Sequence, residues 1–277
     1  MRRIPTREMN DGRELPVLGF GTFPHAGNDS ADAVERALQL GYRLLDTALR
    51  YENEAGVGEG IRRSGVPRHE VVVTSKLPGR YHGRDEVRTA VAESLGNLGL
   101  ECIDLYLIHW PLPRIDRFVD SWRTMIELRD EGVLGSIGVS NFEPEHLRRL
   151  IEETGVVPAV NQVELHPFFP QDALLALHRE LGIVTEAWSP LGRGGDLLDE
   201  PVLAALAEKY GTTTAQVVLR WHLQRGVVPV PMSSNADRQA QNRDVFDFAL
   251  ESEEIVEISA LERGRIWEQD PNTHEEF

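Results

Sequence analysis

The sequence predicts an α/β protein built as one (β/α)8 TIM barrel with an N-terminal β-hairpin and accessory helices. Eight short apolar runs alternate with longer segments of helical periodicity. The composition shows no break along the 277 residues, a length that fits the roughly 250 residues of such barrels. We therefore expect a single domain over residues 1–277 and favour the barrel over a doubly wound open sheet.

The predicted strands are rich in β-branched residues and leucine. In chain order they are Val17–Gly21, Arg43–Asp46, Val71–Ser75, Ile103–His109, Ser136–Val139, Ala159–Val163, Ile183–Trp188 and Val227–Pro231. Helical patterns lie between them, many preceded by Asp, Ser, Asn or Gly and ended by Gly. The clearest are Asp32–Leu40, Asp85–Leu98, Phe118–Arg129, Pro144–Glu153 and Asp172–Leu181.

Further segments extend this barrel. The turn residues Asn10–Gly12 predict a hairpin near the N-terminus. An extra helix is expected at Pro201–Tyr210, before the regular one at Thr214–Gln224, and a last helix near Glu253–Leu261. The polar tail after it, from Trp267, needs a surface against which to become ordered.

Charge and cysteine content narrow the class of protein. The formal net charge is −16 and the sequence pI is near 5.0, which argues against nucleic-acid or anionic-membrane partners because those need clustered Lys and Arg. A single cysteine, Cys102, excludes internal disulfides.

Neither a signal peptide nor an apolar run of about 20 residues is recognised in the sequence, so we expect a protein that is neither exported nor embedded in a membrane. We expect a cytoplasmic monomer.

Polar residues follow most of the predicted strands. Since active sites of such barrels lie at the carboxyl ends of the strands, these residues are functional candidates. They are Asp46, Lys76, His109, Ser140, Asn141, Gln162, Trp188, Ser189 and Ser233, and Tyr51 follows Asp46 within one loop.

Taken singly, most of these residues are explained by a structural role as well as by a catalytic one. Asp46 suits a helix cap, Tyr51 a half-buried aromatic and His109 an interior histidine. Lys76 differs, because only two of the 29 cationic residues are lysines. An amine at a strand end indicates a need for a compact cation.

Taken together, Asp46, Tyr51, Lys76 and His109 suit carbonyl reduction or its reverse. Hydride addition builds charge on the carbonyl oxygen, and a general acid that protonates this oxygen lowers the barrier. A free tyrosine has a pKa near ~10, and a neighbouring ammonium should lower that pKa. Asp46 would hold Lys76 charged, while His109 would orient the carbonyl.

Seven motifs in this order resemble those of the aldo-keto reductases, in particular the prokaryotic diketogluconate-reductase-like branch. The Asp, Tyr, Lys and His of that family fall on Asp46, Tyr51, Lys76 and His109. The motifs are GYRLLDTALRYENEAGVG at 41–58, VVVTSKL at 71–77, DLYLIHWP at 104–111, GVSNFEPEHL at 138–147, NQVELHP at 161–167, AWSPLGRG at 187–194 and PMSSNADRQAQNRDVFDFAL at 231–250.

The resemblance implies an enzyme that binds NADP(H) across the barrel mouth and reduces small carbonyl compounds such as aldehydes, ketones and keto sugars. It implies no metal ion. The matching cofactor positions are Gly21, Thr22, Asp46, Ser140, Asn141, Gln162, Trp188, Ser189, Leu191, Gly192, Met232, Ser233, Ser234, Arg238, Gln241 and Asn242. The matching substrate positions are Phe23, Tyr51, His109 and Trp110, and the tail from Trp267 would close the pocket.

Three positions depart from the family pattern. Trp188 stands where an aromatic residue, commonly tyrosine, stacks on the nicotinamide, and Gln241 stands where the family usually has Glu. Met232 stands where family members that prefer NADPH usually carry a lysine against the 2′-phosphate. Since Arg238 remains, we expect NADPH to be favoured, with NADH also used.

Two other kinds of function stay open from the sequence. A Schiff-base lyase would use Lys76 as its nucleophile, but it would not need the amides Asn141 and Gln162. A non-catalytic nicotinamide-binding regulatory subunit would tolerate loss of the four catalytic positions. All four are filled here, which favours the enzyme.

Overall fold

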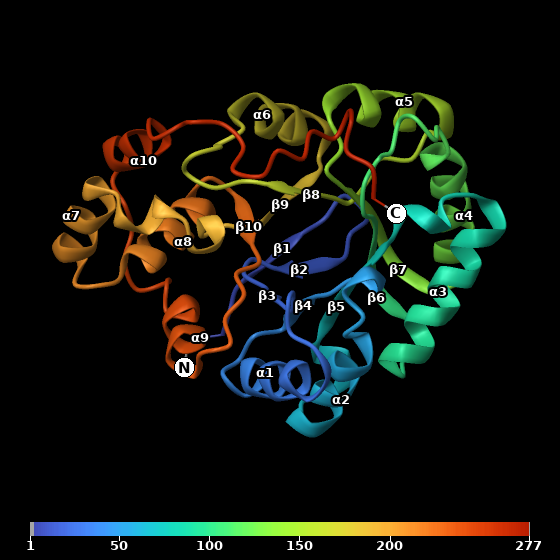
Figure 1. Ribbon diagram of the computed structural model, residues 1–277, viewed down its shortest axis with the longest axis horizontal. Coiled ribbons are helices and arrows are strands. Elements are labelled where there is room, and N and C mark those ends of the chain that lie inside the picture. The colour runs from blue at the N-terminus through green and yellow to red at the C-terminus, as the bar shows by residue number, and fades with distance from the viewer. Residues whose placement is uncertain (1–2, 277) are drawn as a thin grey trace.

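The computed structural model describes residues 3–276, in which eight parallel strands are surrounded by helices (Figure 1). The strands neighbour one another in the order β10-β9-β8-β7-β6-β5-β4-β3. Their bounds are β3 Phe20–Gly21, β4 Leu44–Asp46, β5 Val72–Leu77, β6 Ile103–Ile108, β7 Leu134–Ser140, β8 Val160–Glu164, β9 Val184–Trp188 and β10 Val227–Pro229.

The two edge strands meet and close the barrel. Gly19 N–H donates to Pro229 O at 3.0 Å, and Gly21 N–H donates to Pro231 O at 3.1 Å. Strands β3 and β10 are shorter than the predicted segments Val17–Gly21 and Val227–Pro231. The predicted (β/α)8 barrel is confirmed, as is the hairpin, in which β1 Thr6–Glu8 pairs antiparallel with β2 Glu14–Pro16.

Helices cover the outside of the barrel. They are α1 Gly27–Gln39, α2 Glu54–Ser64, α3 Arg84–Leu98, α4 Phe118–Asp130, α5 Pro144–Thr154, α6 Asp172–Leu181, α7 Pro201–Tyr210, α8 Thr214–Gln224, α9 Ala236–Arg243 and α10 Ser252–Ser259. The accessory helix α7 and the regular helix α8 have the predicted bounds. Helix α1 begins earlier than predicted, at Gly27, because the segment before Asp32 already has helical hydrogen bonding.

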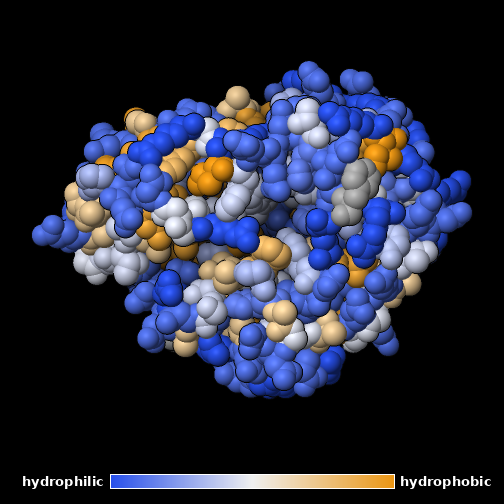
Figure 2. Space-filling view, in the orientation of Figure 1, coloured by the Kyte–Doolittle hydropathy of each residue, from blue (hydrophilic) through white to orange (hydrophobic). Residues whose placement is uncertain are grey.

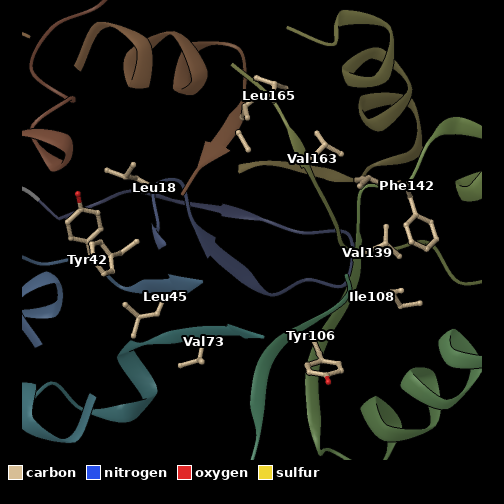
Figure 3. Close-up of a cluster of buried hydrophobic side chains, with 14 of the residues drawn as sticks. Leu18, Tyr42, Leu45, Val73, Tyr106, Ile108, Val139, Phe142, Val163 and Leu165 are labelled. Atoms are coloured by element: carbon tan, nitrogen blue, oxygen red, sulfur yellow. The ribbon is translucent and has the colours of Figure 1, made fainter. Parts of the chain in front are cut away.

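Side chains alternate between two apolar layers. One layer fills the barrel and includes Leu44, Leu105 and Val160. The other lies between strands and helices and includes their neighbours Leu45 and Tyr106. Figure 3 shows this outer layer, with side chains of successive strands pointing away from the barrel axis. Such alternation follows from the two-residue period of a strand, and it fixes which residues point inward at the strand ends.

The C-terminal tail runs from α10 across one end of the barrel towards α4 (Figure 1). Its start is held by Glu164 at the end of β8, whose Oε1 accepts the Ile266 N–H at 2.7 Å. The tail thus becomes ordered on its own barrel. Figure 2 shows the same face hollowed near its centre. Within residues 3–276, no helix combines the length and apolar character needed to cross a membrane.

We expect Gly19→Ala to destabilise the barrel at its seam. A β-carbon at Gly19 would lie 2.8 Å from Val230 Cγ1 and 2.9 Å from Leu44 Cγ, closer than packed side chains tolerate. The free energy of unfolding, measured by urea denaturation, should fall by about 1–3 kcal/mol. Gly96→Ala in α3 is the control, since nothing lies within 4 Å of its added methyl group. Equal stability of the two variants would contradict this account of the seam.

Candidate active site

A cavity of about 840 Å³ opens at the carboxyl ends of the strands. Its floor contains Asp46, His109 and Gln162, and its walls come from loops and from the C-terminal tail. A smaller cavity of about 390 Å³ lies at the other end of the barrel, beside the hairpin. That second cavity lies away from the polar strand ends, so we take the larger one as the candidate active site.

The strand period directs the floor residues inward. Asp46 lies two residues after the interior Leu44, and His109 lies two after the interior Leu107. Gln162 follows the interior Val160 by the same interval. Each polar side chain therefore points into the same space.

A buried ion pair lies beneath the cavity. Lys76 Nζ donates to both carboxylate oxygens of Asp46 at 2.8 Å and to Thr47 O at 2.9 Å. Lys76 is fully buried and Asp46 is 5% exposed. Burial by itself lowers the pKa of Lys76, but the Asp46 carboxylate beside it opposes this, and the pKa lies above its usual value. Lys76 is therefore an ammonium.

Tyr51 lies directly above this ammonium. It ends a short 3-10 helix, Leu49–Tyr51, and its ring centroid is 5.1 Å from Lys76 Nζ. Burial raises the pKa of Tyr51, and Lys76 opposes that rise without cancelling it. The ammonium acts in the expected direction, but the expectation of a net lowered pKa is not met in this structure. The phenol keeps its proton at neutral pH.

Two aromatic rings lie beside Tyr51 in the cavity. The ring centroids of Tyr51 and His109 are 5.9 Å apart, and those of Tyr51 and Phe23 are 5.0 Å apart. Trp110 packs against His274 of the tail, with ring centroids 4.2 Å apart and the two ring planes tilted by 49°. The tail thus forms part of the wall above His109.

Gln162 joins the ion pair to a second buried carboxyl group. Its Nε2 donates to Asp46 Oδ1 at 2.8 Å and to Glu186 Oε2 at 2.9 Å. Burial raises the pKa of Glu186 to about 8, and the Asp46 charge adds to this rise. Glu186 is therefore protonated at neutral pH, and the sequence interpretation missed it. A lone acidic residue inside the apolar run 183–188 was the available signal.

Asn141 fixes the orientation of Trp188. Its Oδ1 accepts the Trp188 indole N–H at 2.8 Å, while its Nδ2 donates to His109 O at 3.0 Å. Asn141 has φ 63°, a left-handed conformation that asparagine tolerates better than most residues. Ser140 Oγ donates to Gln162 O at 2.8 Å. These contacts lock the side chains along one edge of the cavity.

The structure brings most of the predicted site residues to this cavity. Those that line it are Gly21, Thr22, Phe23, Asp46, Tyr51, His109, Trp110, Ser140, Asn141, Gln162, Trp188, Ser189, Leu191 and Met232. The others do not line it. Lys76 lies beneath the floor, Gly192 is buried against Leu197, and Ser233, Ser234, Arg238, Gln241 and Asn242 lie in or just before α9.

Several lining residues were not singled out from the sequence. Arg50 precedes Tyr51, and Glu276 comes from the tail. Arg193 lies between two rings, with its guanidinium carbon 4.9 Å from the Phe23 centroid and 5.1 Å from that of Trp267. No local sequence pattern marks these contacts, because each joins segments that are distant in the chain.

Comparison with known proteins identifies the family. The model of the Aldo/keto reductase family matches residues 17–263. This chain belongs to the aldo/keto reductase family. It is 55% identical over 277 residues to 2,5-diketo-D-gluconic acid reductase B of a Corynebacterium species, covering 100% of both chains. It is 46% identical over 266 residues to methylglyoxal reductase DkgA of Escherichia coli K12, covering 96% of each.

Solved aldo-keto reductases share the same fold. A Bombyx mori aldo-keto reductase in complex with NADP superposes with a TM-score of 0.89 at 38% identity, over 95% of this chain and 94% of that one. A mutant of Gox0644 in complex with NADPH gives a TM-score of 0.94 at 42% identity, over 99% and 100% of the two chains. Both of these neighbours were solved with NADP or NADPH bound.

The residues of the cavity fit a nicotinamide group. The Gln162 amide nitrogen is committed to Asp46 and Glu186, and its Oε1 accepts no hydrogen bond from residues 3–276. This oxygen suits the amide donor of a carboxamide. Trp188 is half-buried at the cavity and held by Asn141, so it offers a fixed aromatic face.

We expect Glu186→Gln to flatten the pH dependence of stability. The folded-state pKa of about 8 exceeds the usual 4.5, so between these pH values the folded protein keeps a proton that the unfolded chain releases. Wild-type stability therefore falls as pH rises through this window, and a glutamine removes that fall. Between pH 5 and pH 8 the variant should lose less stability, by on the order of 1 kcal/mol or more.

Urea denaturation at pH 5, 6, 7 and 8 measures this difference. The exposed Glu208→Gln is the control and should follow wild type. Parallel pH profiles for wild type and Glu186→Gln would show that Glu186 is ionised in the folded protein.

Proposed function

We propose that this chain is an NADPH-dependent oxidoreductase that reduces aldehydes and ketones to alcohols by direct hydride transfer, with Tyr51 as the general acid. The observation that carries the proposal is the contact of Tyr51 with the buried Lys76–Asp46 pair at the floor of one cavity. This arrangement provides a proton donor beside a fixed positive charge.

Tyr51 would protonate the carbonyl oxygen, and Lys76 would stabilise the phenolate that remains. Asp46 keeps Lys76 charged through its two 2.8 Å contacts. His109, on the other side of the oxygen, would set the angle of the carbonyl. NADPH supplies the hydride when it is bound.

We assign the cofactor to the edge of the cavity between Trp188 and α9. Trp188 would stack on the nicotinamide, and the amides Asn141 and Gln162 would bind its carboxamide, with Ser140 assisting. Gly21, Thr22, Ser189, Leu191 and Gly192 would lie along the middle of the dinucleotide. The adenosine end would meet Met232, Ser233, Ser234, Arg238, Gln241 and Asn242, where α9 begins and Asn235 caps its first turn.

The substrates that we propose are small carbonyl compounds, including keto sugars. Phe23 and Trp110 would form the apolar wall of their site, together with Tyr51 and His109. The similarity to a diketogluconic acid reductase and a methylglyoxal reductase supports this range. A Schiff-base lyase is disfavoured, because Lys76 is charged and all three of its donors are engaged.

We also propose that the chain is a single-domain cytoplasmic monomer. One barrel carries the whole candidate site, which supports a single domain. A regulatory subunit without activity is disfavoured, because all four catalytic positions are filled, and turnover of NADPH with methylglyoxal distinguishes it from the enzyme.

Tyr51→Phe should lower kcat with methylglyoxal by about 10²-fold or more, because the acid that protonates the substrate oxygen is lost. Its affinity for NADPH should stay close to wild type, since the hydroxyl acts on the transition state. Steady-state NADPH oxidation and fluorescence titration measure these two effects. Tyr81→Phe, which removes a surface hydroxyl bonded to Glu93, is the control. Turnover near wild type in Tyr51→Phe would remove Tyr51 from the acid role.

Met232→Lys should tighten NADPH binding by roughly one to two decades and leave NADH binding unchanged. Met232 is 37% exposed beside the start of α9, where an ammonium would meet the 2′-phosphate. Fluorescence titration of both cofactors measures the effect, and Met232→Leu is the neutral control. An unchanged NADPH/NADH affinity ratio would mean that residue 232 does not face the 2′-phosphate.

A further inference from the structure

The cavity of about 390 Å³ at the other end of the barrel, which we call the hairpin cavity, is lined by three arginines. Arg7 belongs to β1, Arg179 to the last turn of α6, and Arg225 directly follows α8. The one acidic residue that lines it is Glu8, in a chain whose formal net charge is −16. Of the described residues, none lines both this cavity and the candidate active site.

The strand period places Arg7 on the side of the hairpin that faces the barrel. Met9, two residues later, belongs to the apolar layer that fills the barrel, so Arg7 shares its face. Glu8 lies between them in the sequence and is exposed on the opposite face. Arg7 Nη1 donates to Gly226 O in the turn before β10, which holds the guanidinium at the cavity.

Arg225 is the most deeply buried of the three side chains that we consider, with 7% of it exposed. Its Nη2 donates to Pro170 O at 2.8 Å and contacts the Asp172 carboxylate. Its guanidinium carbon is 4.2 Å from the Trp221 ring centroid. The Asp172 side chain is 74% exposed, so water screens this ion pair and the buried cation is compensated only in part.

Two guanidinium nitrogens of these residues lack an acceptor. Arg7 Nε and Arg225 Nη1 are buried and make no hydrogen bond within residues 3–276. Burial lowers the pKa of both arginines below the usual value, and the nearby Arg179 charge lowers that of Arg225 further, while Asp172 opposes this. Both side chains stay cationic, because arginine keeps its proton in proteins. Buried donors without an acceptor and neighbouring like charges both favour the entry of an anion.

We propose that the hairpin cavity binds a phosphate group, free or as a phosphomonoester, through Arg7, Arg179 and Arg225. These side chains come from three elements and would reach one anion from different sides. A tetrahedral phosphate accepts hydrogen bonds from several directions, whereas a planar carboxylate is matched by one guanidinium fork. The apolar side chains Leu175 and Ile183 also line the cavity, whose volume leaves room for a small organic group on the phosphate.

Isothermal titration calorimetry of the chain saturated with NADPH tests the proposal, since NADPH covers the phosphate-binding positions that we assign at the active site. Inorganic phosphate, added at constant ionic strength, should bind saturably. Acetate should bind at least about tenfold more weakly. Glycerol 3-phosphate distinguishes the two sources of the group: a lower Kd than that of inorganic phosphate assigns the cavity to phosphomonoesters, and an equal or higher Kd assigns it to free phosphate.

Two variants locate the bound ion. Arg7→Gln and Arg179→Glu should each raise the Kd of inorganic phosphate by about tenfold or more, because each removes a charged donor. Arg13→Gln is the control, since Arg13 is an exposed arginine of the same hairpin that does not line the cavity. It should change this Kd by less than about threefold. Circular dichroism checks that each variant is folded, and kcat with methylglyoxal should stay close to wild type in all three.

Several outcomes overturn the proposal. They are no saturable binding of phosphate to wild type, acetate binding as tight as that of phosphate, and a phosphate Kd that either folded variant leaves unchanged or that Arg13→Gln raises equally. Arg179 is exposed, so Arg179→Glu decides the matter if Arg7→Gln does not fold. A wild-type chain that fails to bind NADPH contradicts the proposed function instead, and the same titrations and variants without NADPH then test the cavity.

Discussion

The ion pair between Lys76 and Asp46 is the contact on which the site depends. Both groups lie inside the barrel, where an unpaired charge is costly, so each is retained only because the other is present. Their meeting requires β4 and β5 to keep one register, in which Asp46 pairs with Thr74. The charge on Lys76 therefore depends on the alignment of these two strands.

Gln162 and Glu186 extend this constraint across the barrel. The Gln162 amide on β8 lies between Asp46 on β4 and Glu186 on β9, and it donates one hydrogen bond to each of their carboxyl groups. These hydrogen bonds lie in the apolar interior of the barrel. A second ionised carboxylate next to Asp46 would be repelled, and the protonated Glu186 avoids this. The floor of the cavity therefore carries one negative and one positive charge.

The tail completes the cavity from the opposite direction. It is held at Glu164 and reaches Trp110 and His109 through His274 and Glu276. Glu276 therefore places a carboxylate at the wall of the cavity, 2.7 Å from His109 Nδ1.

The sequence by itself determined the barrel, the position of Asp46, Lys76, His109 and Gln162 at its strand ends, and the resemblance to the family. It did so because the periodicity of a strand is a local property of the sequence. The position of active sites at the carboxyl ends of the strands follows from the topology of the barrel. It did not reveal Glu186 as a protonated partner, and it set the pKa of Tyr51 too low, because burial depends on all the packed neighbours. Only the tertiary structure brought Arg50, Gly79 and Glu276 together, since segments far apart in the chain meet only when the barrel has closed and the tail lies across its mouth.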